Sequence, residues 1–224
     1  LGIFSPNNVE YVAKGENKIC AIMGNTLVDF NLISGEITES ESIFISDEMP
    51  HVDKSTGLNR PGKIVFVDQG KWLLLYPKEL IYWLPKEDKY LSLYTIDNEN
   101  KIVDVVIRKD KIYLTSYEGV IVLSMEGKLT AIKDMEGAYN NIDFCEYGIV
   151  LWGGHNVSVL TESLEVVSQF KTEQQLFFCA TDRKKSLITY GYDPKICNVL
   201  KPNLYCVSNL YETIKTYDGI DSVD

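Results

Sequence analysis

The chain has 224 residues, of which 45% are hydrophobic, and 32 acidic residues against 22 Lys and Arg give a formal net charge of −10. This length and hydrophobicity suffice to bury a full core in one domain, while the acidic excess argues against general binding to nucleic acids or anionic membranes. No apolar run reaches the roughly 18 residues that a membrane-spanning helix needs.

Five apolar segments are predicted as first strands, because each is short, rich in β-branched or aromatic residues and followed by a polar turn. They are residues 9–13, 64–67, 103–107, 141–145 and 176–180. The second strands begin at Ile19, Trp72, Ile112, Ile149 and Leu187. The third strands begin at Leu27, Leu80, Val120, Val157 and Ile196. Less regular fourth strands are expected around Ile37, Leu91, Leu129, Leu164 and Leu204.

The spacing of these strands is nearly constant. Each third strand begins 8 residues after the second, or 9 in the last unit, and successive second strands are 53, 40, 37 and 38 residues apart. A period near 40 with only strand-like segments indicates the blades of a β-propeller. We therefore predict an all-β fold in a single domain of residues 1–224, with five recognisable four-stranded blades that are complete or part of a larger ring. The blades are residues 9–39, 63–96, 102–134, 141–171 and 176–212, with an insertion at 40–62.

Three further expectations concern the ends of the chain and the absence of helices. Only residues 172–176 are expected to tolerate a helical turn, because no segment combines helical spacing with capping signals. The strand-like ends, 2–4 and 213–217, either close the ring or belong to a further blade. The chain begins at Leu1 rather than Met, so we expect a processed chain or part of a longer one.

The resemblance to known repeats rests on four ranges of residues, of which one lies within another. Residues 111–132 (KIYLTSYEGVIVLSMEGKLTAI) resemble the hairpin pair of WD40-like and quinoprotein-like β-propeller repeats. Residues 32–37 (LISGEI) and 125–129 (MEGKL) are similar to the turns between their third and fourth strands, and residues 177–200 resemble a degenerate WD repeat. The resemblance covers nearly the whole chain and implies a divergent propeller, because no Trp-Asp dipeptide ends a third strand.

Alternate turns of a propeller lie on opposite faces, so the first turns of all blades share one face. That face is predicted to be basic, and its residues are Lys18, Lys71, Lys109, Lys111, Arg183, Lys184 and Lys185. The opposite face is predicted to be acidic, with Glu79, Glu118 and Asp193. The basic face either docks an acidic partner or a phosphate-bearing ligand, or its charges only keep exposed turns soluble.

Two apolar segments are candidates for partner binding. The insertion contains Ile43, Phe44 and Ile45, which would add as a strand or enter a groove on a partner, unless the loop is disordered. The second candidate is Tyr82 and Trp83, because an exposed run of such residues has the composition of an interaction hot spot. Packing between blades is the alternative explanation for these two aromatic residues.

No phosphate-loop, dinucleotide, nucleophile-elbow or zinc-protease motif is present, so no catalytic residue, cofactor or metal site is predicted. Glu10, Asp104 and Asp143 occupy inner strands, one per blade, and paired carboxylates in a channel would suit glycoside hydrolysis. A solvated channel explains them equally well. Two weaker patterns are a convergence of His51, His155 and Asp193 on a metal or acid–base site, and a calcium-like run of oxygen ligands at residues 97–100.

The cysteines bear on localisation. Their number, five, is odd, no pair has C-x-x-C spacing, and all fall in predicted strands, which favours buried reduced thiols in a cytoplasmic or nuclear protein. They are Cys20, Cys145, Cys179, Cys197 and Cys206. The triplet Asn156-Val157-Ser158 is weak evidence for secretion.

The function that these patterns favour is a non-enzymatic protein-interaction platform, a scaffold subunit of an intracellular multi-subunit assembly. It would bind other proteins of the complex through its exposed turns and the 39–62 insertion. Two alternatives stay open: a carbohydrate-active hydrolase with channel-lining carboxylates, and a lectin-like propeller that binds a ligand.

Overall fold

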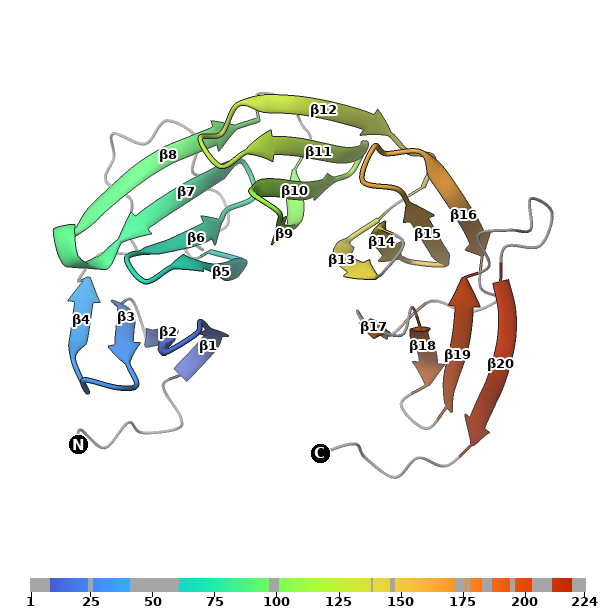
Figure 1. The fold of residues 1–224 in the computed structure, drawn as a ribbon, viewed down its shortest axis with the longest axis horizontal. Coiled ribbons are helices and arrows are strands. Elements are labelled where there is room, and N and C mark those ends of the chain that lie inside the picture. The colour runs from blue at the N-terminus through green and yellow to red at the C-terminus, as the bar shows by residue number, and fades with distance from the viewer. Residues whose placement is uncertain are drawn as a thin grey trace. The chain divides into compact units, whose positions relative to one another are not determined.

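A computed structural model describes residues 9–23, 26–40, 61–96, 101–137, 139–145, 148–171, 176, 178–182, 187–193, 196–202 and 211–218. Within these ranges the chain forms strands β1–β20 and one described 3-10 helix, η2 (Pro85–Glu87). Each run of four consecutive strands makes a four-stranded sheet (Figure 1). The prediction of an all-β chain built from four-stranded sheets that match propeller blades is confirmed.

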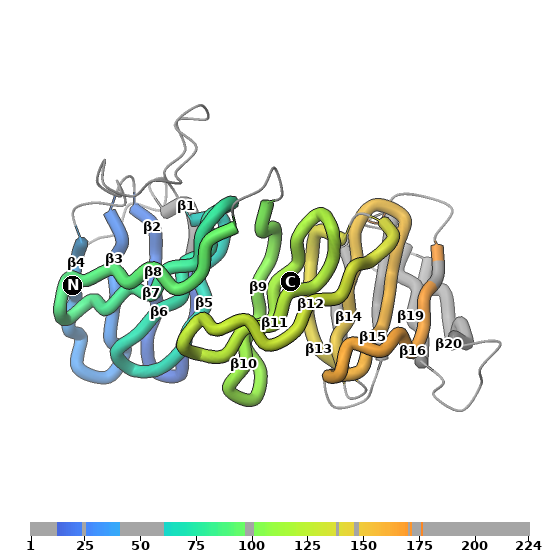
Figure 2. Tube along the Cα trace, turned by 90° about the horizontal axis from the view of Figure 1, so that it is seen from above, coloured from blue at the N-terminus to red at the C-terminus, as the bar shows by residue number. Residues whose placement is uncertain are grey.

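The first two sheets are built from the N-terminal part of the chain. Sheet 1 consists of β1 (Val9–Lys14), β2 (Lys18–Met23), β3 (Thr26–Asn31) and β4 (Ile37–Ser40). Sheet 2 consists of β5 (Lys63–Asp68), β6 (Lys71–Leu75), β7 (Glu79–Leu84) and β8 (Lys89–Thr95). All strand pairs in both sheets are antiparallel, and Figure 2 shows β2, β3 and β4 running side by side.

The remaining sheets repeat this arrangement. Sheet 3 consists of β9 (Ile102–Arg108), β10 (Lys111–Ser116), β11 (Gly119–Ser124) and β12 (Leu129–Asp134). Sheet 4 consists of β13 (Asn141–Cys145), β14 (Gly148–Gly153), β15 (Asn156–Leu160) and β16 (Val166–Lys171). Sheet 5 consists of β17 (Phe178–Asp182), β18 (Leu187–Asp193), β19 (Ile196–Pro202) and β20 (Tyr211–Asp218).

The chain divides into two compact units, and the division runs through sheet 3. Unit 1 comprises Leu1–Ile112 and Leu123–Thr130, and unit 2 comprises Tyr113–Val122 and Ala131–Asp224. In unit 1 the buried core centres on Trp72, Trp83, Ile81 and Leu27. In unit 2 one core cluster contains Cys145 and the valines of β14 and β15. The prediction of one domain over residues 1–224 stays a prediction.

The middle strands are buried because they are apolar on both faces. The side chains of β6 from Trp72 to Leu75 are all buried, and so are those of β10 from Ile112 to Ser116. Continuous apolar runs of this kind are typical of strands covered on both faces. In sheet 1, by contrast, buried and half-buried side chains alternate along β2.

Three predictions about irregular segments are wrong. Leu164 is not in the fourth strand of sheet 4: it lies in the preceding turn with φ of +66°, and β16 begins at Val166. The fourth strand of sheet 5 is β20, which pairs with β19, rather than a strand around Leu204. Residues 172–175, where a helical turn was expected, lie outside the described residues, but the expectation that no other segment forms one is wrong, because η2 is such a turn and Pro85 supplies the preset φ of a first helical position.

The described cysteines agree with the prediction of reduced thiols. Cys20 and Cys145 are buried and not disulfide-bonded, and burial raises the pKa of the Cys20 thiol. The sequon, however, gives no support for glycosylation, because Ser158 is fully buried and its hydroxyl lies 2.7 Å from that of Tyr139. No helix among the described residues is long and apolar enough to cross a membrane.

Candidate interaction surface

Hydrogen bonds lock the turn that joins β3 to β4. The Asn31 amide donates to the Glu36 carbonyl oxygen at 2.9 Å, and the Gly35 amide donates to the Asn31 carbonyl oxygen at 2.9 Å. The Asn31 side-chain oxygen accepts the amides of Ile33 and Ser34 at 2.9 and 3.1 Å, as Asn commonly does at turns. Gly35 has φ of +72°, which a residue without Cβ adopts at little cost. The backbone of this turn is therefore held in one conformation.

Two large aliphatic side chains occupy the tip of this turn. Leu32 is 48% exposed and Ile33 is 77% exposed, the highest value for a large hydrophobic residue in the described part of the chain. The Leu32 amide also donates to the Asn17 carbonyl oxygen at 2.9 Å, which ties the tip to the β1–β2 turn. A rigid backbone that presents apolar side chains to water loses little conformational entropy on binding a partner.

Equivalent turns elsewhere show that this geometry does not require apolar residues. The turns at residues 124–128 and 161–165 are one residue shorter; each is also closed by a hydrogen bond from the amide of its first residue to the carbonyl oxygen of its last, and each is capped by a Ser or Thr hydroxyl. Their exposed tips carry Glu126 and Ser163 where the β3–β4 turn carries Ile33. The prediction that residues 32–37 and 125–129 form turns between third and fourth strands is confirmed.

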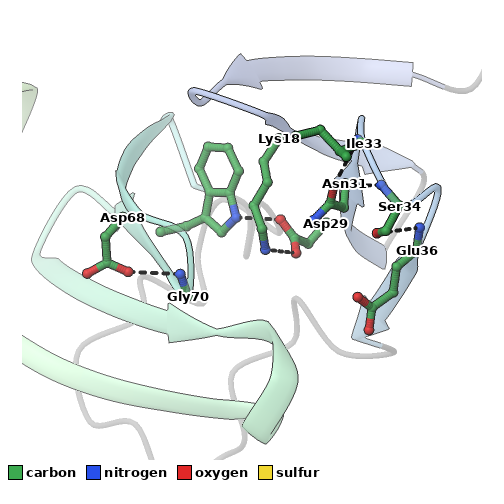
Figure 3. A network of polar contacts seen from close by, with 9 residues as sticks. Lys18, Asp29, Asn31, Ile33, Ser34, Glu36, Asp68 and Gly70 are labelled. Carbon is green, nitrogen blue, oxygen red and sulfur yellow. Dashed lines mark hydrogen bonds and ion pairs between the residues drawn. The ribbon is translucent and has the colours of Figure 1, made fainter.

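A buried polar network lies at the base of the β3–β4 turn (Figure 3). The Lys18 ammonium contacts one Asp29 carboxylate oxygen at 2.6 Å, and both side chains are 3% exposed. The indole N–H of Trp72 donates to the other oxygen of Asp29 at 2.8 Å, which links sheet 1 to sheet 2. Lys18 is paired in register with Asn31, so this network holds the strand residue at which the turn begins.

A second ordered turn, between β5 and β6, appears in the same view (Figure 3). The Gly70 amide donates to the Asp68 carboxylate at 2.8 Å, and the Lys71 ammonium lies 3.9 Å from the same carboxylate. Lys71 also lies 4.7 Å from the ring centroid of Tyr82, whose hydroxyl donates to the Met125 carbonyl oxygen at 2.7 Å. Most of the polar groups at this turn are therefore engaged within unit 1.

The buried tyrosines of unit 1 predict an alkaline loss of stability. Burial raises the pKa of Tyr82 to about 12, and the charges of Glu126 and Asp68 add to the shift; burial also raises the pKa of Tyr76. An unfolded tyrosine titrates near 10, so between pH 10 and 12 the unfolded state loses protons that the folded state keeps. We expect the thermal midpoint to hold up to about pH 10 and then fall as the pH rises to 12. Tyr82→Phe should lower the midpoint at pH 8 but flatten this fall, and an equally steep fall in the variant would contradict the assignment.

The prediction of an exposed aromatic patch at Tyr82 and Trp83 is wrong. Trp83 is fully buried and stacks on Tyr90, with ring centroids 6.4 Å apart and 15° between the planes. Tyr82 is only 5% exposed, and Pro85 is buried. Both faces of β7 are covered, so packing rather than partner binding accounts for these side chains.

The predicted basic face is only partly supported. Lys18 does not belong to it, because its ammonium is buried against a carboxylate. Lys71 is half-buried, and Lys109 and Lys111 are exposed at the β9–β10 turn. Residues 183–185 lie outside the described residues. On the opposite face the prediction is wrong for Glu79, which is buried and accepts a hydrogen bond from a serine hydroxyl of β8.

Of the three candidate channel acids, Asp104 forms an ion pair with a lysine. Asp104 is buried, lies 2.6 Å from the Lys63 ammonium and accepts the Val105 amide at 2.8 Å. A lysine therefore neutralises the charge of this carboxylate. Asp143 is half-buried in β13, and the side chain of Glu10 is outside the described set.

The weak metal-site patterns gain no support. Among the described residues no three His, Cys, Asp or Glu side chains are grouped to hold an ion. His155 is exposed in the β14–β15 turn, whereas His51 and residues 97–100 lie outside the described residues, as does the side chain of Asp193. The partner-binding candidates Ile43, Phe44 and Ile45 also lie outside them.

Sequence reasoning missed the tip of the β3–β4 turn as a candidate surface. The sequence predicts that residues 32–37 form a turn, but the prediction of binding surfaces does not include the apolar residues of this turn. The available signal was the pair Leu32-Ile33 between Asn31 and a Ser-Gly dipeptide. Two aliphatic residues inside such a turn cannot both point into the core, because the turn reverses the chain at the edge of the sheet.

No protein family and no curated protein matches this chain. Solved structures do match it. The WD40 domain of Neurospora crassa Pan2 is 15% identical, with a TM-score of 0.56, and 71% of this chain is covered. BamB from Moraxella catarrhalis is 10% identical, with a TM-score of 0.61 and 92% of this chain covered. A chain of the mitotic checkpoint complex is 9% identical, with a TM-score of 0.69 and 96% of this chain covered.

These likenesses confirm the predicted type of fold, a β-propeller. At such low identity they concern the fold alone. The chain spans 50%, 60% and 66% of the lengths of these three matched chains.

Proposed function

We propose that the protein is a non-enzymatic interaction platform in which the five sheets act as propeller blades, and that it docks another protein through the Leu32-Ile33 tip. The observation that carries this proposal is an exposed aliphatic pair on a turn that is locked by hydrogen bonds. Burial of the exposed part of these aliphatic side chains against a partner would be favourable. At the position of Ile33 the turns at 124–128 and 161–165 carry Glu126 and Ser163, so packing within the blade does not require an aliphatic residue there.

The proposed partner is a protein of an intracellular assembly, in the cytoplasm or nucleus, with an apolar pocket. Support for this location comes from the odd number of cysteines and from Cys20 and Cys145, which are buried and not disulfide-bonded. A non-enzymatic role fits the lysine-paired carboxylate of Asp104. The 39–62 insertion remains a second proposed docking element.

The test compares partner recovery between variants of the tagged chain. In the double variant Leu32→Ser and Ile33→Ser, the turn keeps its backbone hydrogen bonds but loses its apolar tip, so partners recovered in stoichiometric amounts with the wild type should fall at least tenfold. The matched control is Ile132→Ser, because Ile132 is also exposed, at 56%, but lies on β12. A photo-crosslinking residue at position 33 should then join the chain to the same partner.

A deletion of residues 41–60 tests the second element. If the insertion docks, the deletion weakens recovery of the partner while the thermal midpoint is kept. Equal partner recovery from wild type, tip variant and deletion would refute both docking elements, and recovery of the chain alone would refute the platform function.

A further inference from the structure

One face of sheet 1 is apolar but incompletely covered. The register of β2 with β3 places Ile19 opposite Phe30 and Ala21 opposite Val28, so these side chains share a face. Ile37 of β4 joins them, because it is paired with Phe30. Ile19, Ala21 and Phe30 are half-buried, Ile37 is 42% exposed and Val28 alone is buried. We call these five residues the open face of sheet 1.

The opposite face of the same sheet behaves differently. It carries Cys20, Ile22 and Leu27, which are at most 2% exposed and belong to the core cluster that contains Trp72. Sheet 2 therefore covers that face, whereas the side chains that alternate with it in β2 stay half-buried. The corresponding strands β6 and β10 are buried on both faces. The residues of the open face are therefore as apolar as those of a packed face, but they are less buried.

Opposite charges flank the open face. Lys14 is paired with Ile19 and Glu39 is paired with Val28, so both belong to this face, on the two outer strands of the sheet. Both side chains are exposed. Lys14 is level with Ile19 and Glu39 is level with Ala21, so the two charged residues are offset along the strand direction by two residues, or about 7 Å. A lysine side chain can bridge such an offset while its stem lies on apolar surface.

We propose that the open face of sheet 1 binds the same face of a second copy of this chain. A two-fold axis parallel to the strands would stack β1 of one copy over β4 of the other and bring each Lys14 toward the Glu39 of the partner copy. Two-fold dimers bury one self-complementary patch on both chains, and sheets that pack face to face interdigitate apolar side chains about 10 Å apart. The charges on opposite edges make this face complementary to itself.

The first experiment measures the mass of the 224-residue chain by light scattering after gel filtration, from 1 to 100 µM. We expect a dimer of twice 25.4 kDa for the wild type. The variant Ile37→Ser should weaken dimerisation at least tenfold, since it removes apolar contact at a position that the monomer leaves 42% exposed. Ile132→Ser, which alters an exposed position of β12, should leave the dimer intact. A monomeric wild type at every concentration would overturn the proposal.

Charge reversal provides the second experiment, with exposed residues whose replacement leaves the fold intact. Lys14→Glu and Glu39→Lys should each raise the dissociation constant about tenfold, because each creates two like-charge contacts across the two-fold axis. The double reversal should restore the wild-type value. A dimer that tolerates both single reversals and Ile37→Ser would use another surface and would overturn the proposal. These readouts are independent of the Leu32-Ile33 tip, so the dimer and the interaction platform can fail separately.

Discussion

Replacement of Asp29 by alanine is expected to lower the free energy of unfolding by about 3–5 kcal/mol, the range for removal of one partner from a buried ion pair. Lys18 and Asp29 are each 3% exposed, so the variant leaves an ammonium buried without its counter-charge. The indole N–H of Trp72 loses its acceptor as well. Urea denaturation followed by tryptophan fluorescence measures the change.

Two further variants make this result specific. Asp68→Ala removes a carboxylate that is 57% exposed and 3.9 Å from Lys71, and it should cost only about 1 kcal/mol or less. The double variant Lys18→Met and Asp29→Leu should regain only the part of the loss that comes from the unpaired ammonium, since apolar residues often replace a buried ion pair without penalty, whereas the Trp72 indole N–H still lacks its acceptor. If Asp29→Ala cost no more than Asp68→Ala, the network would not anchor the base of the β3–β4 turn.

Gly148→Ala should destabilise the chain by a similar amount, about 3–5 kcal/mol. Gly148 begins β14 with φ of +144°, a conformation that side chains rarely adopt. A Cβ at this position would lie 2.1 Å from the Leu160 carbonyl oxygen on β15, so the strand pair would have to separate. Thermal unfolding followed by circular dichroism measures the change.

Gly154→Ala is the matched control, because it separates backbone strain from steric overlap. Gly154 lies in the turn between the same two strands and has φ of +54°, but a Cβ there would meet nothing within 4 Å. Its replacement should therefore cost only about 1–2 kcal/mol. Equal losses for both variants would show that φ alone, and not the contact with β15, requires glycine at position 148.

Much of the fold was predictable because strand positions depend on local sequence. Apolar segments with period-2 or continuous character, separated by polar turns at constant spacing, give the strands of each sheet within a few residues of the observed bounds. The predictions failed where local signals are weak. The fourth strand of sheet 5 was misplaced because outer strands are irregular, and Leu164 was assigned to a strand although its hydrophobic side chain lies in a turn.

The candidate surface was less predictable, because exposure depends on neighbouring sheets. Trp83 has the composition of a binding hot spot, yet the core of unit 1 buries it completely. Lys18 follows a polar turn like the other predicted basic residues, but Asp29 and Trp72 draw it into the interior. Conversely, Leu32 and Ile33 look like core residues and are exposed.

The strands, their hairpin spacing and the turns between third and fourth strands follow from the amino-acid sequence, since they depend on residues near one another in the chain. Which faces of the sheets are covered depends instead on how the sheets pack. The sequence of a strand with alternating side chains, such as β2, does not show whether neighbouring sheets cover one of its faces or both. The burial of Lys18 and the open face around Phe30 and Ile37 follow from sheet packing, which brings together residues that are distant in sequence.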